Sequence, residues 1–270
     1  MVSYAVGDVT VLENTISLIS RQGSAAQRWI LRRPAPASAH RLFCFCYAGG
    51  NAAVFLPWQA ALGVNIEVCA IQLPGHGARF GEPFLDSMAS AVAAIATAIT
   101  PLLDRPFSFF GHSLGALLAF EVSHHLRAHA LPLPQQLIVS GAQGPHSPRS
   151  GRQIHLLDDA ELKCELERYS GTPQAILNNP EFLMMVLPII RADFRIVNDY
   201  VSTVRPPLPV KISVFAGRDD EMVDAEQCDD WFAETTSRGK LHWFDGNHFF
   251  INTSTEQVLE QLATIVSSAR

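Results

Sequence analysis

The feature that most constrains this chain is a Gly-x-Ser-x-Gly turn between two apolar segments, Phe-Ser-Phe-Phe-Gly-His-Ser-Leu-Gly-Ala-Leu-Leu-Ala-Phe at residues 107–120. The residues before the turn predict a buried strand, and those after it a buried helix. A strand that turns into a helix at a serine is typical of a nucleophile elbow, in which the serine backbone is strained. Side chains at the flanking positions would collide with neighbouring elements, and Gly111 and Gly115 avoid this. The pattern therefore predicts that Ser113 is held above the edge of a sheet.

Short apolar runs and helical patterns alternate along most of the chain. Each run ends in a turn rich in glycine, proline or polar residues, as expected for the buried strands of a parallel sheet. Besides the elbow strand and its helix, the expected strands are 41–47, 66–72, 136–141, 210–216 and 240–244, and the expected helices are 88–103 and 255–267. This alternation predicts an α/β fold with a mostly parallel, doubly wound sheet.

The alternation stops over residues 146–207, where only helical patterns are found. Asp158 is expected to begin one helix, which Gly171 ends, and Asn179 to begin another. The apolar residues of the second helix either pack on the sheet or roof a substrate channel as a lid, where methionine gives an adaptable lining. Both alternatives stay open. The second one makes three side chains candidates for substrate binding: Phe182, Met184 and Met185.

A serine, an acid and a histidine occur along the chain in the order found in the catalytic triad of α/β-hydrolases. Ser113 is the expected nucleophile, and it needs a base because a free hydroxyl is hardly ionised near neutral pH. His248, after the last strand, is the expected base, since imidazole titrates at about 6.5. Asp220 is the expected acid, which would hold the imidazole in one tautomer.

The acid and the base each have an alternative. Asp220 fits a Gly-x-x-Asp-x-x-Val spacing with Gly217 and Val223, whereas Asp219 fits only if the turn is one residue shorter. His76, in a glycine-rich turn, is a weaker second histidine for the site. We favour Asp220 and leave Asp219 open.

Two backbone N–H groups are expected to form an oxyanion hole. The loop Tyr-Ala-Gly-Gly at 47–50 follows the first strong strand, and its Ala48 would donate together with Leu114 at the start of the elbow helix. No phosphate-binding or dinucleotide fingerprint and no metal-ligand spacing occurs in the sequence. We therefore expect an acyl-transfer hydrolase without a metal or cofactor.

Composition excludes several classes of protein and partner. The chain has 270 residues and a net charge of −6, which suits one large domain and disfavours nucleic acid as a partner. Its five cysteines are an odd number and form no Cys-x-x-Cys pair, which argues against a disulfide framework and against a zinc site. Its longest apolar segment, 88–103, is shorter than the ~20 residues that span a bilayer. Residues 1–27 have the pattern of neither a signal nor a transit peptide, so we expect a cytoplasmic protein. We also expect a monomer.

Several short motifs occur together in one known enzyme family. Besides the elbow they are Cys-Tyr-Ala-Gly-Gly at 46–50, Gln-Leu-Pro-Gly-His-Gly-Ala-Arg at 72–79 followed by Glu-Pro, Leu-Pro-Ile-Ile-Arg-Ala-Asp-Phe at 187–194, and Gly-Asn-His-Phe-Phe at 246–250. With them the chain resembles the type II, stand-alone editing thioesterases of polyketide and non-ribosomal peptide synthesis. The resemblance covers a domain over 29–270, with the lid at about 146–207, and leaves an N-terminal extension, 1–28, without a role.

The sequence departs from the family pattern at two places. Cys46 and Tyr47 stand where the family has Pro-His, and Asn247 replaces a glycine before the histidine. Neither change removes a predicted catalytic group.

The resemblance implies an activity and a partner. The activity is hydrolysis of acyl thioesters on the phosphopantetheine arm of acyl or peptidyl carrier proteins, which clears stalled or wrongly primed chains. The alternative is a product-releasing thioesterase or an acyltransferase with the same triad.

Carrier proteins are typically acidic, so arginines in and beside the lid are expected to dock them. These arginines are Arg149, Arg152, Arg191, Arg195 and Arg205. The alternative is that they are solvated or paired with acidic residues of the chain, which are Asp158, Glu161, Asp193 and Asp199.

Overall fold

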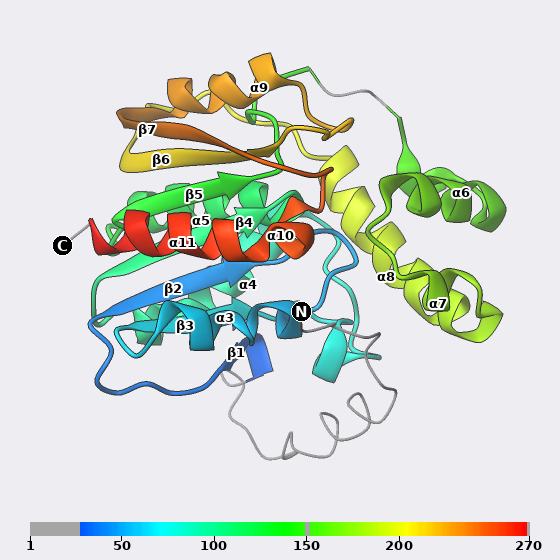
Figure 1. Ribbon diagram of the computed structural model, residues 1–270, viewed down its shortest axis with the longest axis horizontal. Coiled ribbons are helices and arrows are strands. Elements are labelled where there is room, and N and C mark those ends of the chain that lie inside the picture. The colour runs from blue at the N-terminus through cyan, green and yellow to red at the C-terminus, as the bar shows by residue number, and fades with distance from the viewer. Residues whose placement is uncertain (1–27, 149–151, 269–270) are drawn as a thin grey trace.

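The computed structural model describes residues 28–148 and 152–268, and a seven-stranded sheet forms its centre (Figure 1). The strands lie in the order β1-β3-β2-β4-β5-β6-β7. Only the pair of β1 and β3 is antiparallel among these neighbouring strands. The bounds are β1 Ile30–Arg32, β2 His40–Phe45, β3 Ile66–Ile71, β4 Phe107–His112, β5 Gln136–Ser140, β6 Leu208–Gly217 and β7 Thr235–Phe244.

Alternate residues of the central strands pack against two layers of helices. In β2, Leu42 and Cys44 point to one face of the sheet and Phe43 and Phe45 to the other, and all four are fully buried. The face of Phe43 is covered by α4 (Met88–Ile99), α5 (Leu114–Ala128) and α9 (Ala225–Asp229), and the opposite face by α3 (Trp58–Leu62) and α11 (Thr255–Ser267) (Figure 1). This confirms the predicted doubly wound α/β fold.

The register brings the carboxyl ends of several strands to one edge of the sheet. Phe45 of β2 lies opposite Gly111 of β4, and Gly217 of β6 lies opposite Phe244 of β7. The loops that follow these four strands therefore open side by side, as ligand-binding loops of such sheets do.

In the described chain between β5 and β6, all regular secondary structure is helical. They are the short η4 (Ile154–Leu156), α6 (Asp159–Tyr169), α7 (Gln174–Leu177) and α8 (Pro180–Asn198), and they project beyond the carboxyl ends of the strands (Figure 1). Asp158 caps α6 through a reciprocal bond with Glu161, as predicted. The helix ends at Tyr169, two residues before Gly171, because Ser170 instead of the glycine takes the left-handed conformation, with φ 57°. Asn179 caps α8.

Two strands differ from the sequence-based expectation. β1 has no counterpart among the predicted strands, since three residues at the sheet edge show no periodic pattern. β7 begins at Thr235, whereas the sequence predicted a start at residue 240. The apolar pattern missed its first half because those residues are polar and mostly exposed along an outer edge of the sheet. The proposed N-terminal extension lies, except for Arg28, outside the described residues. Within residues 28–148 and 152–268, no helix combines the length and apolarity needed to cross a bilayer.

Candidate active site

The elbow serine lies between β4 and α5 in a backbone conformation that residues other than glycine rarely adopt. Ser113 has φ 56° and ψ −118°, and its N–H donates to the Ser140 carbonyl at 2.8 Å. A Cβ on Gly111 would lie 2.1 Å from the Gly115 carbonyl oxygen, and one on Gly115 would lie 2.1 Å from that of Phe45. The two glycines therefore permit the close approach of β2, β4 and α5 that the sequence predicted.

The candidate acid and base meet across the loops that follow β6 and β7. His248 Nδ1 lies 2.8 Å from Asp220 Oδ2, and both side chains are almost fully buried. The other carboxylate oxygen of Asp220 accepts the Met222 N–H at 2.8 Å. Because a carboxylate accepts, Nδ1 carries the hydrogen and Nε2 is left as the acceptor. Asp220, and not its neighbour Asp219, supplies the carboxylate bonded to the imidazole. Asp219 instead donates its backbone N–H to the Gly246 carbonyl at 3.0 Å.

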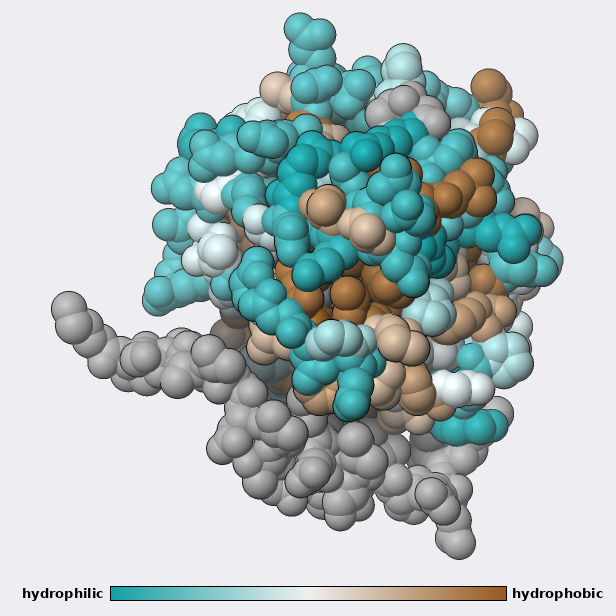
Figure 2. All heavy atoms as spheres, turned by 90° about the vertical axis from the view of Figure 1, so that its right-hand side faces the viewer, coloured by the Kyte–Doolittle hydropathy of each residue, from teal (hydrophilic) through white to brown (hydrophobic). Residues whose placement is uncertain are grey.

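The predicted nucleophile, base and oxyanion donors line one cavity of about 180 Å³. Ser113, Leu114, Ala48 and His248 all line it, and Asp220 lies behind His248. Figure 2, seen from the side of the lid, shows apolar surface near the middle of this face with hydrophilic residues around it. The remaining wall consists of Leu117, Gly141, Ala142, Gln143, Arg152, Gln153, Ile154, Tyr169, Phe194, Val197, Asn198, Met222 and Val223.

The lid contributes residues to this cavity, but not the three that we expected. Met184 is 72% exposed, and Met185 and Phe182 are 47% and 46% exposed; none of them lines the cavity. The reason is the helical period: α8 turns the face of Leu187, Ile190, Phe194 and Val197 inward and leaves the methionines outside. This corrects the expected lining. The spacing of the inward residues in the sequence could have identified them.

The loop after β2 leaves one N–H available at the cavity. Gly49 donates to Asp193 Oδ2 at 2.7 Å, and Gly50 donates to the Tyr47 carbonyl at 2.9 Å. In the described part of the chain, the Ala48 N–H has no acceptor within the protein. Leu114 is the first residue of α5, where helix N–H groups have no partner within the helix. Both N–H groups belong to residues that line the cavity beside Ser113.

His112, the residue between Gly111 and Ser113, is a buried neighbour of the candidate base. Its ring centroid lies 5.1 Å from that of His248, and its Nδ1 lies 2.9 Å from Ser140 Oγ. Burial, reinforced by the neighbouring His248, holds the pKa of His112 well below its ordinary value. His112 therefore stays neutral and places no positive charge beside the His248 ring.

The arginines expected to dock a carrier protein are engaged within the chain. Each of these arginines that the structure describes pairs with a carboxylate of the chain. Of the acidic residues expected as partners, Asp199 is the one that takes part in these pairs. Arg205 donates two hydrogen bonds to Glu121, and Arg191 also donates to two backbone carbonyls of the lid. Arg191 and Arg205 therefore stabilise the folded chain. Arg149 lies outside the described residues. The pairs are Arg152–Glu165, Arg191–Asp159, Arg195–Asp199 and Arg205–Glu121.

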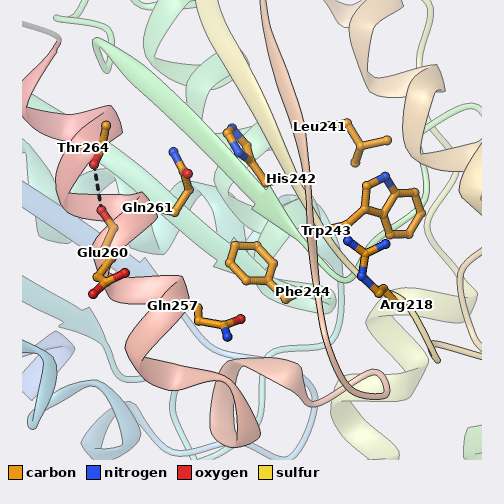
Figure 3. Close-up of a pocket in the computed structure, with 9 residues that line it drawn as sticks. All are labelled: Arg218, Leu241, His242, Trp243, Phe244, Gln257, Glu260, Gln261 and Thr264. Carbon is orange, nitrogen blue, oxygen red and sulfur yellow. Dashed lines mark hydrogen bonds between the residues drawn. The ribbon is translucent and has the colours of Figure 1, made fainter.

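A second, larger hollow of about 540 Å³ lies between β7 and α11 (Figure 3). Trp243 and Arg218 lie together at one side of it, and residues of α11 such as Gln261 form the other. It is polar and shares no lining residue with the cavity at Ser113. Within the described residues, no cluster of three or more histidine, cysteine or acidic side chains could hold a metal ion.

The family model for a thioesterase domain matches residues 40–266 of this chain. The chain belongs to the thioesterase family. Two relatives of this thioesterase cover most of its length. The linear gramicidin dehydrogenase LgrE of Brevibacillus parabrevis is 37% identical over 89% of this chain and 93% of its own. The gramicidin S biosynthesis protein GrsT of Aneurinibacillus migulanus is 34% identical over 88% of this chain and 93% of its own. The first name refers to a redox activity, unlike the matching family model.

Solved structures agree with the family. The type II thioesterase BorB from the borrelidin biosynthetic cluster has a TM-score of 0.82 and 32% identity, covering 91% of this thioesterase and 99% of its own chain. The thioesterase RedJ from the prodiginine pathway of Streptomyces coelicolor has a TM-score of 0.80 and 34% identity, over 92% and 98% of the two chains. The chain therefore is a hydrolase-family protein with the α/β-hydrolase fold of type II thioesterases.

Proposed function

We propose that this thioesterase hydrolyses acyl thioesters on the phosphopantetheine arm of acyl or peptidyl carrier proteins and thereby clears stalled or wrongly primed chains. One observation carries the proposal: Ser113 at a strained elbow and the Asp220–His248 pair meet at one cavity beneath the lid. These are the groups that acyl transfer through a serine needs.

In the first half of the reaction, His248 Nε2 takes the Ser113 proton while Oγ attacks the thioester carbonyl carbon. The carbonyl oxygen becomes negative and receives hydrogen bonds from the Ala48 and Leu114 N–H groups. The C–S bond then breaks, and the thiol leaves with the proton from His248. An acyl group remains on Ser113.

In the second half, a water molecule gives a proton to His248 and its oxygen attacks the acyl carbon. The same two N–H groups stabilise the oxyanion, the Oγ–acyl bond breaks, and Ser113 recovers its proton from His248. Asp220 stays ionised throughout and stabilises the charged imidazole that forms in each half.

The substrate class and partner follow from the site and from the relatives. A cavity of about 180 Å³ suits a short acyl chain. Relatives named for gramicidin S, borrelidin and prodiginine biosynthesis support a carrier-bound substrate. A solved variant of the yersiniabactin type II thioesterase, in which one serine is replaced by alanine, supports a serine nucleophile. On this proposal the protein acts as a cytoplasmic monomer.

Intact-protein mass spectrometry of acylated carrier proteins tests the function. Carriers loaded with acetyl, butyryl, octanoyl or aminoacyl groups are incubated with the wild type and with Ser113→Ala. We expect the wild type to remove the acyl mass from at least the short-chain carriers and release free acid, while Ser113→Ala is inactive. Acyl groups that appear on an added amine or alcohol instead of water would identify an acyltransferase. Carriers that keep their acyl groups would refute the proposed hydrolysis.

A further inference from the structure

A buried carboxylate of the lid joins three parts of the chain that are distant in sequence. Asp193 of α8 is 2% exposed, and its Oδ2 accepts the Gly49 N–H at 2.7 Å. The same oxygen lies 2.9 Å from Nε2 of His76, which is 4% exposed and sits in the loop after β3. The carboxylate therefore connects the lid helix, the loop after β3 and the loop after β2.

The geometry of His76 fixes its charge. Its Nδ1 lies 2.9 Å from the Pro74 carbonyl oxygen, and its Nε2 faces the Asp193 carboxylate. Both partners can only accept, so both ring nitrogens carry hydrogen and the ring is an imidazolium. Burial alone would lower the pKa of His76, but the hydrogen bond and the charge of Asp193 outweigh it and raise that pKa. The pair is thus a buried ion pair, and His76 has no nitrogen left to act as a catalytic base.

Gly49 is held by the lid at two points. Besides the bond to Asp193, a Cβ on Gly49 would lie 2.7 Å from Ile190 Cγ1, so the α8 side chain already packs against this residue. Gly49 has φ +73° and directly follows Ala48, the candidate oxyanion donor. The bond to Asp193 therefore holds the Ala48–Gly49 peptide, which is joined through the Ala48 Cα to the peptide that carries the candidate donor.

We infer that Asp193, held by His76, is a positioning residue that fixes the Ala48 N–H for the oxyanion. The inference rests on the proposed function. It makes the lid helix part of the transition-state geometry as well as a wall of the cavity, because the loop that carries the donor is bonded to α8 through a buried carboxylate.

The experiment compares binding of the tetrahedral state with binding of the ground state. In an alkylboronic acid complex, the Ser113 hydroxyl adds to boron, its proton passes to His248, and a boron-bound oxygen occupies the oxyanion position. A pantetheine amide, which is not cleaved, reports ground-state binding. Asp193→Ala and Asp193→Asn are measured against Asp199→Asn, an exposed aspartate at the end of the same helix.

Removal of one oxyanion donor costs roughly 10²–10³-fold in rate, so its mispositioning in Asp193→Ala should lower kcat/KM by about 10–100-fold. We expect boronate affinity to fall in parallel and amide affinity to stay within about twofold. Asp193→Asn keeps an oxygen that can accept from Gly49, so its loss should be smaller. Asp199→Asn should match the wild type.

Several results would overturn the inference. One is wild-type boronate affinity in a folded Asp193→Ala protein, and another is an equal loss of boronate and amide binding. If the Asp193 variants do not fold, His76→Gln is measured instead, since it keeps a donor toward Asp193 but not the charge; we expect about threefold to tenfold weaker boronate binding, and unchanged binding would refute the role. Ser113→Ala separates the two ideas, because hydrolysis by that variant would refute the proposed function whatever Asp193 does.

Discussion

At the scale of single residues, the site depends on side chains whose positions the backbone fixes. Ser113 keeps its positive φ because glycines at both flanking positions let β4 and α5 close around it. The two adjacent aspartates after β6 have different surroundings: Asp220 points to His248, and Asp219 contributes a backbone bond to Gly246. One residue of register therefore separates a candidate catalytic carboxylate from an ordinary turn residue.

The first prediction concerns these two aspartates. Asp220→Asn should lower kcat for a short acyl-pantetheine by about 10²–10⁴-fold, because an amide no longer stabilises the charged imidazole or holds its tautomer. Asp219→Asn is the matched control and should stay within about threefold of the wild type. Steady-state kinetics on both variants, with thermal unfolding to check the fold, decides between them. The reverse ranking would make Asp219 the acid.

At the scale of elements, α8 has two faces with different environments. Its inward face carries Phe194 and Val197 into the cavity, whereas Met184 lies on the outside and is largely exposed. A single helix thus lines the cavity at Ser113 and presents an apolar surface to solvent.

This division predicts different effects of truncation on the two faces. Phe194→Ala should lower kcat/KM for short acyl thioesters by about tenfold, since truncation of this large, partly buried side chain removes about 1.5 kcal/mol of apolar contact. Met184→Ala, the same change on the outer face, should have less than a twofold effect. Rates with acetyl and octanoyl thioesters measure both. A larger effect of Met184→Ala would restore the methionines as substrate-binding residues.

The elements show which structure the sequence can predict. The buried central strands were predictable because each is a continuous apolar run, as in Phe43 to Phe45. β1 and the first half of β7 were not predictable, because β1 has only three residues and β7 is polar from Thr235 onward until its apolar second half. Ser113, Asp220 and His248 followed from chain order and turn spacing. The His76–Asp193 pair did not, since its members are 117 residues apart and nothing in the motifs that contain them, 72–79 and 187–194, marks the two residues as partners.

At the scale of the whole molecule, the His76–Asp193 pair connects the lid helix to the loop after β3. We expect this pair to make the stability of the fold depend on pH. The charged groups that act on the His76 ring are Asp193, which raises its pKa, and Arg79, which lowers it. The net shift is upward from the unfolded value of about 6.5. The folded protein therefore binds the proton more tightly, so this stabilisation is fully present below about pH 6.5 and is lost as pH rises through the folded pKa.

Thermal unfolding of the wild type and His76→Gln between pH 5 and 9 measures this dependence. The Tm difference between the two proteins should be largest at the acidic end and shrink as the pH rises past the folded pKa of His76. A difference that is constant or that grows with pH would show that the imidazole is not charged in the folded protein.

The central claim is that Ser113 carries the acyl group between the two halves of the reaction. The most direct measurement is rapid mixing with excess acyl-pantetheine, acid quenching and intact-protein mass spectrometry with peptide mapping. We expect the enzyme to gain the mass of one acyl group, mapped to Ser113, and a Ser113→Ala protein to gain none and to show no turnover. Turnover by a folded Ser113→Ala protein, or an acyl group mapped to another residue, would contradict it.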